Sequence, residues 1–356
     1  MSELRKDLVT GRWVIIATER SKRPDDFRPA SPEKKESASI FCPFCLGNES
    51  KTPPEVFALR ENGTGPDGPG WRVRVVPNKF PALSPGAPPP KSAKGIFQWM
   101  PGVGIHEVII ENPDHDKELS DLEAAHISDV LQVCRERIKA IEEELHYQYV
   151  QVFKNKGKEA GASLSHPHSQ IVATPIVPKR VKEEVYGSER LFRTNKECIF
   201  CRTLREETTL SERLVLRNDR FCVIAPFASR SPFEMGIYPL RHSPLFTSAG
   251  DEELASLAGV LKTVLTKLKT MLSDPPFNLI LHQAPNPTVS QKAWPGIEQY
   301  FHWHIEILPV LTKVAGFEWG TGFYINPVPP ETAAGFLRKD KKQAASRDTV
   351  LSTKTG

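Results

Sequence analysis

Residues 161–172 read Gly-Ala-Ser-Leu-Ser-His-Pro-His-Ser-Gln-Ile-Val, and we expect the rest of the chain to position them. Pro167 does not sit comfortably inside a helix, and the apolar residues at the end of the stretch favour a strand. Because side chains alternate between the two faces of a strand, His166, His168 and Gln170 are predicted to project on one face. Two imidazoles and an amide behind a turn of small residues suit chemistry on a phosphate group. A simpler interpretation, two ordinary histidines on a loop, is typical of an isolated histidine.

The pattern around this stretch occurs twice along the chain, so the stretch is not isolated. Each half contains a Cys-x-x-Cys turn, strands, a histidine, a long helix, a further strand and then His-x-His. Long helices are predicted at residues 119–146 and 252–272, where apolar residues recur at three- and four-residue steps. Residues 155–165 are predicted to form a glycine-containing turn. The order repeats without strong identity, which indicates an internal duplication at the scale of a domain rather than a solenoid.

The length of the chain, 356 residues, suits two domains or one domain built from two similar halves. We predict an N-terminal half over residues 1–180, which carries the opening stretch, and a C-terminal half over residues 190–338. Residues 175–197 are predicted to be charged connectors. The polar residues 339–356 are predicted to be a disordered tail.

Composition and charge limit the classes of partner. A hydrophobic content of 39% and a charged content of 25% are ordinary for a globular protein. The net charge of +4 is consistent with phosphorylated ligands but too small to predict nucleic-acid binding. No apolar run approaches the roughly 18 residues of a membrane span, and residues 1–10 lack the apolar core of a signal peptide. We therefore expect no membrane partner and a cytoplasmic location.

Cysteine and histidine positions predict two metal sites. The two Cys-x-x-Cys pairs are more typical of metal ligands than of disulfides in a reducing compartment, and a redox role requires a different context. Two Cys and two His form a tetrahedral zinc set, and a site with four protein ligands is closed and therefore structural. We predict one zinc site in each half, with iron or no metal as alternatives for the second. The candidate ligands are Cys42, Cys45, His115 and His166 in the first half, and Cys198, Cys201, His242 and His302 in the second.

Only the first His-x-His follows a loop that can hold a phosphate. If His166 binds metal, the adjacent backbone is pinned and His168 is free to react as a nucleophile. Glycines in the preceding loop let backbone N–H groups approach phosphate oxygens, and Ser163 adds a hydroxyl. The loop before His302 has much proline, which lacks the N–H, and Glu306 stands where the first half has Gln170. His304 is then either structural or a ligand of the second site.

The motif His166-Pro167-His168-x-Gln170, preceded by Asn155-x-Gly157 and Gly161-Ala162-Ser163, resembles the active-site signature of the galactose-1-phosphate uridylyltransferase family. This family belongs to the histidine-triad superfamily, and the resemblance covers roughly residues 5–338. It implies an α+β fold of two histidine-triad-like halves, with an antiparallel sheet flanked by helices. It also implies a homodimer.

The same resemblance implies a mechanism and roles for individual residues. His168 would attack the α-phosphorus of a nucleotide sugar, and a second phosphate compound would then take the nucleotide from the histidine. Ser163 and Gln170 would contact the transferred phosphate, in the loop that contains Asn155, Gly157 and Gly161. Asn78 and Phe44 would lie near the nucleoside, and the zinc ligands would be Cys42, Cys45, His115 and His166. Arg23 lies in a basic loop that is either a solvated charge run or a phosphate contact.

Two features resemble the branch that includes ADP-glucose phosphorylase: the second pair, Cys198 and Cys201, and the segment at residues 320–327. The first interpretation is a uridylyltransferase acting on UDP-glucose and galactose 1-phosphate, and the second is an ADP-glucose phosphorylase. A histidine-triad nucleotide hydrolase and a non-enzymatic zinc-stapled binding module are further alternatives. The loop before His168 argues against the binding module. Gln170 argues against the hydrolase, because a third histidine there would assist the leaving group.

Overall fold

The computed structural model describes residues 1–20, 42–61, 63–86, 90–144 and 147–339. Arg23 lies outside the described residues, and so does the predicted tail except for Lys339. Within the described residues, no helix is both long enough and apolar enough to span a bilayer.

A single ten-stranded sheet runs through both halves of the chain, and every neighbouring pair of its strands is antiparallel. The strand order is β10-β11-β12-β14-β13-β8-β9-β7-β4-β3. This confirms the predicted antiparallel sheet, whereas the domain boundaries near residues 180 and 190 stay a prediction. The strands are β3 (Phe57–Arg60), β4 (Trp71–Pro77), β7 (Ile105–Ile110), β8 (Tyr149–Lys156), β9 (His168–Thr174), β10 (Leu214–Arg217), β11 (Phe221–Ile224), β12 (Met235–Pro239), β13 (Phe277–His282) and β14 (His304–Pro309).

The register of the two central strands relates the halves to each other. Phe153 of β8 pairs with Ile280 of β13. Phe153 also pairs with Gln170 of β9, and Ile280 pairs with Glu306 of β14. An approximate twofold axis therefore passes between Phe153 and Ile280. It exchanges β8 with β13, β9 with β14, and β7 with β12, which is the internal duplication that the repeated motifs predict.

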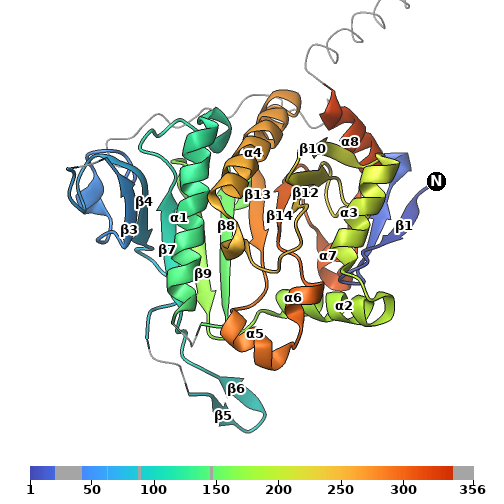
Figure 1. Cartoon of the computed structure of the whole chain (residues 1–356), viewed down its shortest axis with the longest axis horizontal. Helices are drawn as coiled ribbons and strands as arrows, with labels where there is room; N and C mark the ends of the chain where they lie inside the picture. Colours follow the sequence, from blue (N-terminus) through green and yellow to red (C-terminus); the bar gives the residue numbers. More distant parts are fainter. Residues whose placement is uncertain (21–41, 62, 87–89, 145–146, 340–356) are drawn as a thin grey trace, which may run out of the picture.

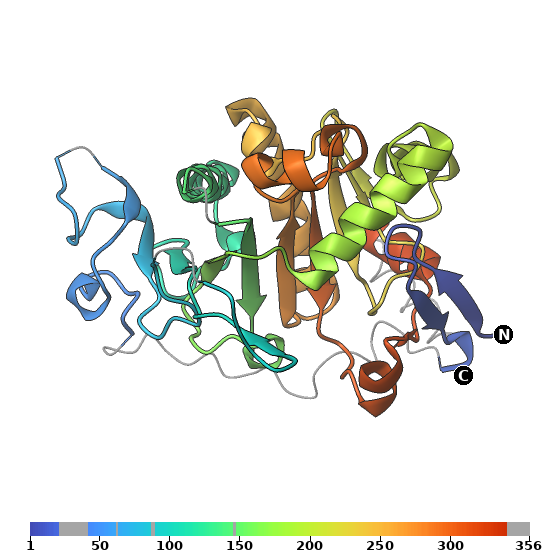
Figure 2. The same ribbon diagram turned by 90° about the horizontal axis from the view of Figure 1, so that it is seen from below.

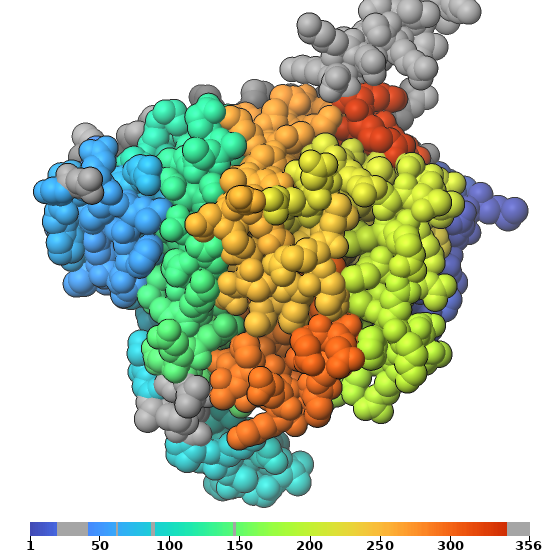
Figure 3. Space-filling view, viewed as in Figure 1, coloured from blue at the N-terminus to red at the C-terminus, as the bar shows by residue number. Residues whose placement is uncertain are grey.

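Two long helices cover one face of this sheet. Helix α1 (Ala124–Glu142) and helix α4 (Asp251–Met271) lie side by side across it, one from each half (Figure 1). Their surfaces are continuous on this face of the molecule (Figure 3). Helix α4 agrees with the prediction to within one residue at each end. Helix α1 begins later than predicted, after a short 3-10 turn at Leu119–Asp121.

Helix α2 (Lys179–Asn195) corrects the prediction of a charged connector over residues 175–197. Val181 and Val185 are one helical turn apart and both are buried, so the segment has an apolar face despite its charges. Gly187 lets this helix approach the N-terminal segment, because a Cβ there would lie 1.8 Å from the Val9 carbonyl oxygen. Figure 2 shows α2 beside the N-terminal strands.

The remaining strands and helices lie outside the large sheet. Strands β1 (Glu3–Lys6), β2 (Trp13–Ile16) and β15 (Tyr324–Asn326) form a separate three-stranded sheet. The hairpin of β5 (Ser92–Lys94) and β6 (Phe97–Trp99) projects from the body of the molecule (Figures 1 and 3). The other helices are α3 (Ile199–Leu210), α5 (Pro287–Ala293), α6 (Ile297–Tyr300), α7 (Gly316–Thr321) and α8 (Pro330–Arg338).

Two boundaries near the opening stretch differ from the prediction. Strand β9 begins at His168, so His166 precedes the strand instead of lying on it. Pro167 has no N–H to donate to a neighbouring strand, which explains why the ladder starts after it. Strand β8 extends to Lys156, so Asn155 lies on a strand and not in the predicted turn.

Candidate active site and metal sites

The first four predicted ligands meet in one cluster. Cys42 and Cys45 come from a tight turn, His115 from the loop after β7, and His166 from the residues before β9, and their ligand atoms all lie within 4.8 Å of one another. The Cys45 Sγ is 3.3 Å from the His115 Nδ1 and 3.6 Å from the His166 Nδ1. Tetrahedral zinc with ordinary Zn–S and Zn–N bonds would separate S and N by about 3.6 Å. The side chains therefore form a set that can bind a metal.

Hydrogen bonds to the far ring nitrogens direct the lone pairs of both histidines towards this cluster. The His166 Nε2–H donates to the Asn112 carbonyl oxygen at 2.9 Å, so its Nδ1 lone pair points at the thiols. The His115 Nε2 lies 3.1 Å from the Ser165 Oγ. Burial lowers the pKa of His166 to about 4, which keeps the imidazole neutral as a metal ligand requires.

The second cluster has the same four residue types, but here Cys198 caps helix α3 and Cys201 lies in its first turn, where the sequence predicted a turn like the first. Cys198, Cys201, His242 and His302 have ligand atoms within 4.8 Å of one another. The Cys201 Sγ lies 3.3 Å from the His242 Nδ1 and 3.5 Å from the His302 Nδ1. The Nε2 groups of His242 and His302 donate to backbone carbonyl oxygens at 2.7 and 2.9 Å, which again leaves Nδ1 for a metal.

His168 is held by the backbone of His166. Its Nδ1–H donates to the His166 carbonyl oxygen at 2.8 Å, so the lone pair of the ring is on Nε2. Burial lowers the pKa of His168 below its ordinary value, which favours the neutral imidazole. The Phe44 ring lies against His168 with its centroid 5.5 Å away. A neutral imidazole with a free Nε2 is the form in which histidine acts as a nucleophile.

A cavity of about 740 Å³ opens beside His168. The first half contributes Asn155, Gly157 and Ser163 to its walls, and the second half contributes residues 272–276 with Val310 and Leu311. Of the other predicted contacts, Gly161, Asn78, Phe44 and Gln170 lie outside this lining.

Two contacts between the halves shape the loop that borders the cavity. The Asn278 Nδ2 donates to the Asn155 Oδ1 at 2.9 Å and to the Ala160 carbonyl oxygen at 2.8 Å. Gly157 has a positive φ of 84°, and a Cβ there would lie 2.9 Å from the Pro276 Cβ. Glycine is required at this position both for the backbone conformation and for the close approach of the second half.

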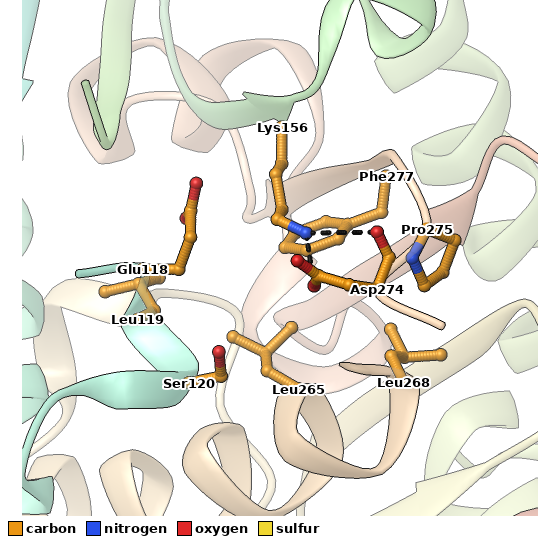
Figure 4. Close-up of a pocket in the computed structure, with 9 residues that line it drawn as sticks. All are labelled: Glu118, Leu119, Ser120, Lys156, Leu265, Leu268, Asp274, Pro275 and Phe277. Atoms are coloured by element: carbon orange, nitrogen blue, oxygen red, sulfur yellow. Dashed lines mark hydrogen bonds and ion pairs between the residues drawn. The ribbon is translucent and has the colours of Figure 1, made fainter. Parts of the chain in front are cut away.

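A smaller cavity of about 10 Å³ adjoins the first (Figure 4). Here the Lys156 Nζ lies 2.5 Å from the Asp274 Oδ1 and 5.7 Å from the centroid of the Phe277 ring. Asp274 and Lys156 line both cavities, so this ion pair joins the end of β8 to the loop before β13.

Gln170 lies two residues after His168 on the same face of β9. Its Oε1 is 2.8 Å from the His106 Nε2, and the Asn78 Nδ2 is 3.1 Å from the same nitrogen. Two residues predicted to contact substrate, Gln170 and Asn78, thus both lie against the ring of His106.

A buried charge network lies behind His168, and the sequence did not predict it. The Lys154 Nζ lies 2.9 Å from the Glu111 Oε2, and the Ser169 Oγ–H donates to the Glu111 Oε1 at 2.6 Å. The Lys154 Nζ is also 3.5 Å from the His168 carbonyl oxygen. Ser169 was visible in the opening stretch, but Lys154 and Glu111 are brought to it only by the pairing of three strands.

Comparison with known proteins places the chain in a family. The family model described as galactose-1-phosphate uridyl transferase, N-terminal domain, matches residues 1–178. A second model, described as a domain of unknown function (DUF4921), matches residues 121–350. A galactose-1-phosphate uridylyltransferase from Thermotoga maritima is 31% identical over 95% of this chain and 98% of its own length. The chain belongs to the galactose-1-phosphate uridylyltransferase family.

The chain is also similar to ADP-glucose phosphorylases. The ADP-glucose phosphorylase of Arabidopsis thaliana is 39% identical over 95% of this chain and 92% of its own length. A crystal structure of an ADP-glucose phosphorylase from A. thaliana with bound ADP-glucose superposes with a TM-score of 0.79 and 36% identity. That superposition covers 96% of this chain and 100% of the other. The α+β fold and membership of a family of nucleotidyltransferases, both expected from the motif, are confirmed.

In the second half, the histidine equivalent to His168 is His304, and both faces of its ring are covered. His304 is stacked between Tyr238 and His282, with ring centroids 5.0 and 4.6 Å away. Glu306, which replaces Gln170, lies 2.5 Å from Arg230 and 3.2 Å from His282. Rings therefore pack against both faces of His304, in agreement with a structural role, and we call the second half the filled half and the first half, with its cavity, the open half.

A third group of potential metal ligands, Glu184, His282 and His304, lies in this filled region. Burial alone would lower the pKa of His282, but Glu184 and Glu306 raise it to about 10. The ion pairs with the two carboxylates favour the protonated ring, so a metal at this group would have to displace a proton from His282. Glu184 comes from α2, the helix that the sequence analysis missed, so this ion pair could not be found from the repeat alone.

Proposed function

We propose that the protein transfers a nucleoside monophosphate from a nucleotide sugar to a phosphate compound through a covalent bond to His168. The observation that carries the proposal is the hydrogen bond from the His168 Nδ1–H to the His166 carbonyl oxygen. It fixes the tautomer in which Nε2 has the lone pair, at the edge of a cavity of about 740 Å³. This volume lies within the range that is usual for small-molecule sites.

In the first step the His168 Nε2 attacks the α-phosphorus of the nucleotide sugar. A P–N bond forms, the P–O bond to the sugar phosphate breaks, and the sugar 1-phosphate leaves with the bonding electrons. In the second step an oxygen of the acceptor phosphate attacks the same phosphorus. The P–N bond then breaks, and the histidine returns to its neutral form.

The residues around the cavity suggest how the charge on phosphorus is held. We assign Asn155, at the end of β8, and Gly157, Gly161 and Ser163, in the loop that follows it, to the cradle of the phosphate, since Asn155, Gly157 and Ser163 line the cavity. The amide of Gln170 is assigned to the transferred phosphate. Asn78 and Phe44 are assigned to the nucleoside side of His168, and Arg23 stays a predicted phosphate contact.

We assign zinc to both Cys/His clusters. Each has four potential protein ligands whose ligand atoms lie within 4.8 Å of one another, so a zinc ion held by all four would be closed to substrate and structural. In the first half, Cys42, Cys45, His115 and His166 would hold it. The metal would fix the position of His166, and thereby the carbonyl oxygen that orients His168.

The identities of the nucleotide and the acceptor distinguish the two leading interpretations. The first, from the motif, is UDP-glucose with galactose 1-phosphate, and it is supported by relatives such as the T. maritima enzyme. The greater identity to the A. thaliana ADP-glucose phosphorylase, 39% against 31%, favours ADP-glucose as donor and inorganic phosphate as acceptor. We propose ADP-glucose phosphorolysis as the activity to test first.

The family resemblance also supports a homodimer. Sedimentation equilibrium of the purified chain would measure its mass directly, and a mass of one chain at all concentrations would contradict this assignment.

The covalent step can be tested by labelling. The protein is incubated with ADP-glucose or UDP-glucose carrying ³²P at the α-phosphorus, without acceptor, and acid-labile radioactivity on the protein is counted. We expect label on the wild type, none on His168→Gly, and label on the matched variant His304→Gly. Zinc content should be the same in His168→Gly as in the wild type. Labelling of His168→Gly at the wild-type rate would overturn the mechanism.

The same preparation identifies the substrates. The donor that labels the protein shows which base is accepted. Release of the label by inorganic phosphate indicates a phosphorylase, and release by galactose 1-phosphate indicates a uridylyltransferase-type acceptor. Release by water alone at a comparable rate would instead support the hydrolase.

A further inference from the structure

His106 on β7 is held in one tautomer by the backbone. The Ala82 N–H donates to the His106 Nδ1 at 3.1 Å. A backbone N–H can only donate, so Nδ1 must be the unprotonated nitrogen and the ring proton is on Nε2. The direction of the next hydrogen bond is thereby fixed.

The His106 Nε2–H faces the side-chain amide of Gln170. The distance from Nε2 to the Gln170 Oε1 is 2.8 Å. Because Nε2 is a donor, the amide atom facing it must be the oxygen, and the Gln170 –NH2 group points the other way. Among the hydrogen bonds of the described residues, none engages that –NH2 group. Gln170 therefore presents a donor on the face of β9 that carries His168.

Asn78 is arranged around the same nitrogen. Its Oδ1 accepts the N–H of Phe80 at 2.9 Å, which turns its –NH2 group towards His106. The Asn78 Nδ2 lies 3.1 Å from the His106 Nε2, but both atoms carry hydrogens. The Asn78 –NH2 group thus keeps its hydrogens for another acceptor. The ring of His106 therefore lies between the side chains of Gln170 and Asn78, and each of these side chains has an –NH2 group that can donate to another acceptor.

The second half has a different device at the equivalent position. Val108 of β7 pairs with Gln170, and Gly236 of β12 pairs with Glu306. Two residues earlier along the chain are His106 on β7 and Glu234, which directly precedes β12. Glu234 binds Arg230, which in turn binds Glu306. In the second half, ion pairs thus hold Glu306 in place. In the first half, the neutral ring of His106 orients the amide of Gln170.

We propose that His106 is a positioning residue that aims the Gln170 –NH2 group at the phosphate being transferred. This inference rests on the proposed function, since it names the residue that orients one of its phosphate contacts. Without the Nε2 donor, the amide of Gln170 can rotate and present its oxygen to the phosphate, which would repel it.

Two substitutions separate the two ring nitrogens of His106. In His106→Asn the side-chain oxygen replaces Nδ1 as acceptor for Ala82, but no donor reaches Gln170. In His106→Gln the side-chain –NH2 group lies near the position of Nε2 and can donate to Gln170. We expect single-turnover labelling by the donor sugar nucleotide to slow about tenfold in His106→Asn, as for loss of one hydrogen bond. His106→Gln should restore most of the rate.

A double-substitution test separates positioning from a general structural role. In a Gln170→Leu background, His106→Asn should cause no further loss, because there is no amide left to orient. The ¹⁵N spectrum of the His106 ring should show a protonated Nε2 that shifts on Gln170→Leu. Equal losses in both backgrounds, or wild-type labelling by His106→Asn, would overturn the inference. Absence of label on the wild type with either donor would instead defeat the proposed function, and the ¹⁵N result would still decide the hydrogen bond.

Discussion

Lys154 carries a positive charge that the fold buries directly behind the proposed nucleophile. Its side chain is 1% exposed and that of its partner Glu111 is 0% exposed. Burial alone would lower the pKa of Lys154, but Glu111 and Glu118 raise it above its ordinary value, so the lysine stays charged. The pair also holds Ser169, the residue after the nucleophile. The backbone around His168 is thus supported by buried polar side chains that pair with one another: Lys154 with Glu111, and Glu111 with Ser169.

Removing the charge of Lys154 should therefore be costly. Lys154→Met leaves Glu111 buried without its cation, and we expect unfolding free energy to fall by about 3–5 kcal/mol. The matched control is Lys262→Met, whose partner Glu123 is 87% exposed and whose loss should cost less than about 1 kcal/mol. Urea unfolding of both variants measures the difference. Equal unfolding midpoints would contradict the role assigned to the buried pair.

At the scale of elements, helix α1 ends in a turn that contains a poorly solvated carboxyl group. Burial raises the pKa of Glu142 to about 7, and the Gln283 Nε2 donates to its Oε1 at 3.2 Å. The folded state thus binds a proton at Glu142 that the unfolded chain, with an ordinary glutamate pKa near 4.5, has already lost. Stability from this group is complete below about pH 4.5 and is lost as the pH rises through about 7.

Glu142→Gln should remove this pH dependence. The amide cannot ionise, so the variant should be more stable than the wild type at pH 8, by at most about 3 kcal/mol, and similar to it at pH 4.5. The neighbouring exposed residue offers a control in Glu143→Gln. Unfolding free energies at several pH values between 4.5 and 8 would test this. A variant whose pH profile parallels that of the wild type would refute the assignment.

Local signals predicted some elements well and others poorly, for physical reasons. The apolar spacing of α4 made its limits clear, and the Cys-x-x-Cys turns with their histidines were sufficient to predict which side chains meet at each cluster. Helix α2 was missed because its many charges hide a narrow apolar face around Val181 and Val185. The contact of Lys154 with Glu111 and the hydrogen bond from His106 to Gln170 depend on the register of strands β7, β8 and β9. A single sequence does not specify the register of strands that are so far apart along the chain.

At the scale of the whole molecule, the duplication has left one open half and one filled half. Strands β9 and β14 are separated by β8 and β13, which places the axes of these two strands about 14 Å apart across the sheet. The two Cys/His clusters contain the same residue types, but the histidine after the first, His168, lines a cavity, whereas His304 after the second is stacked between two rings. Equivalent changes in the two halves should consequently have different effects on the reaction.

Paired cysteine substitutions test this asymmetry. Cys42→Ser with Cys45→Ser should remove one zinc per chain and slow labelling of His168 about 10–100-fold, because the His166 carbonyl oxygen is no longer held. Cys198→Ser with Cys201→Ser should also remove one zinc and lower the melting temperature, yet leave the labelling rate near that of the wild type. Metal analysis, thermal unfolding and single-turnover labelling of the same preparations give all three quantities. If the second pair abolished labelling while the protein stayed folded, the two halves would be coupled through β8 and β13, and the filled half would take part in the reaction.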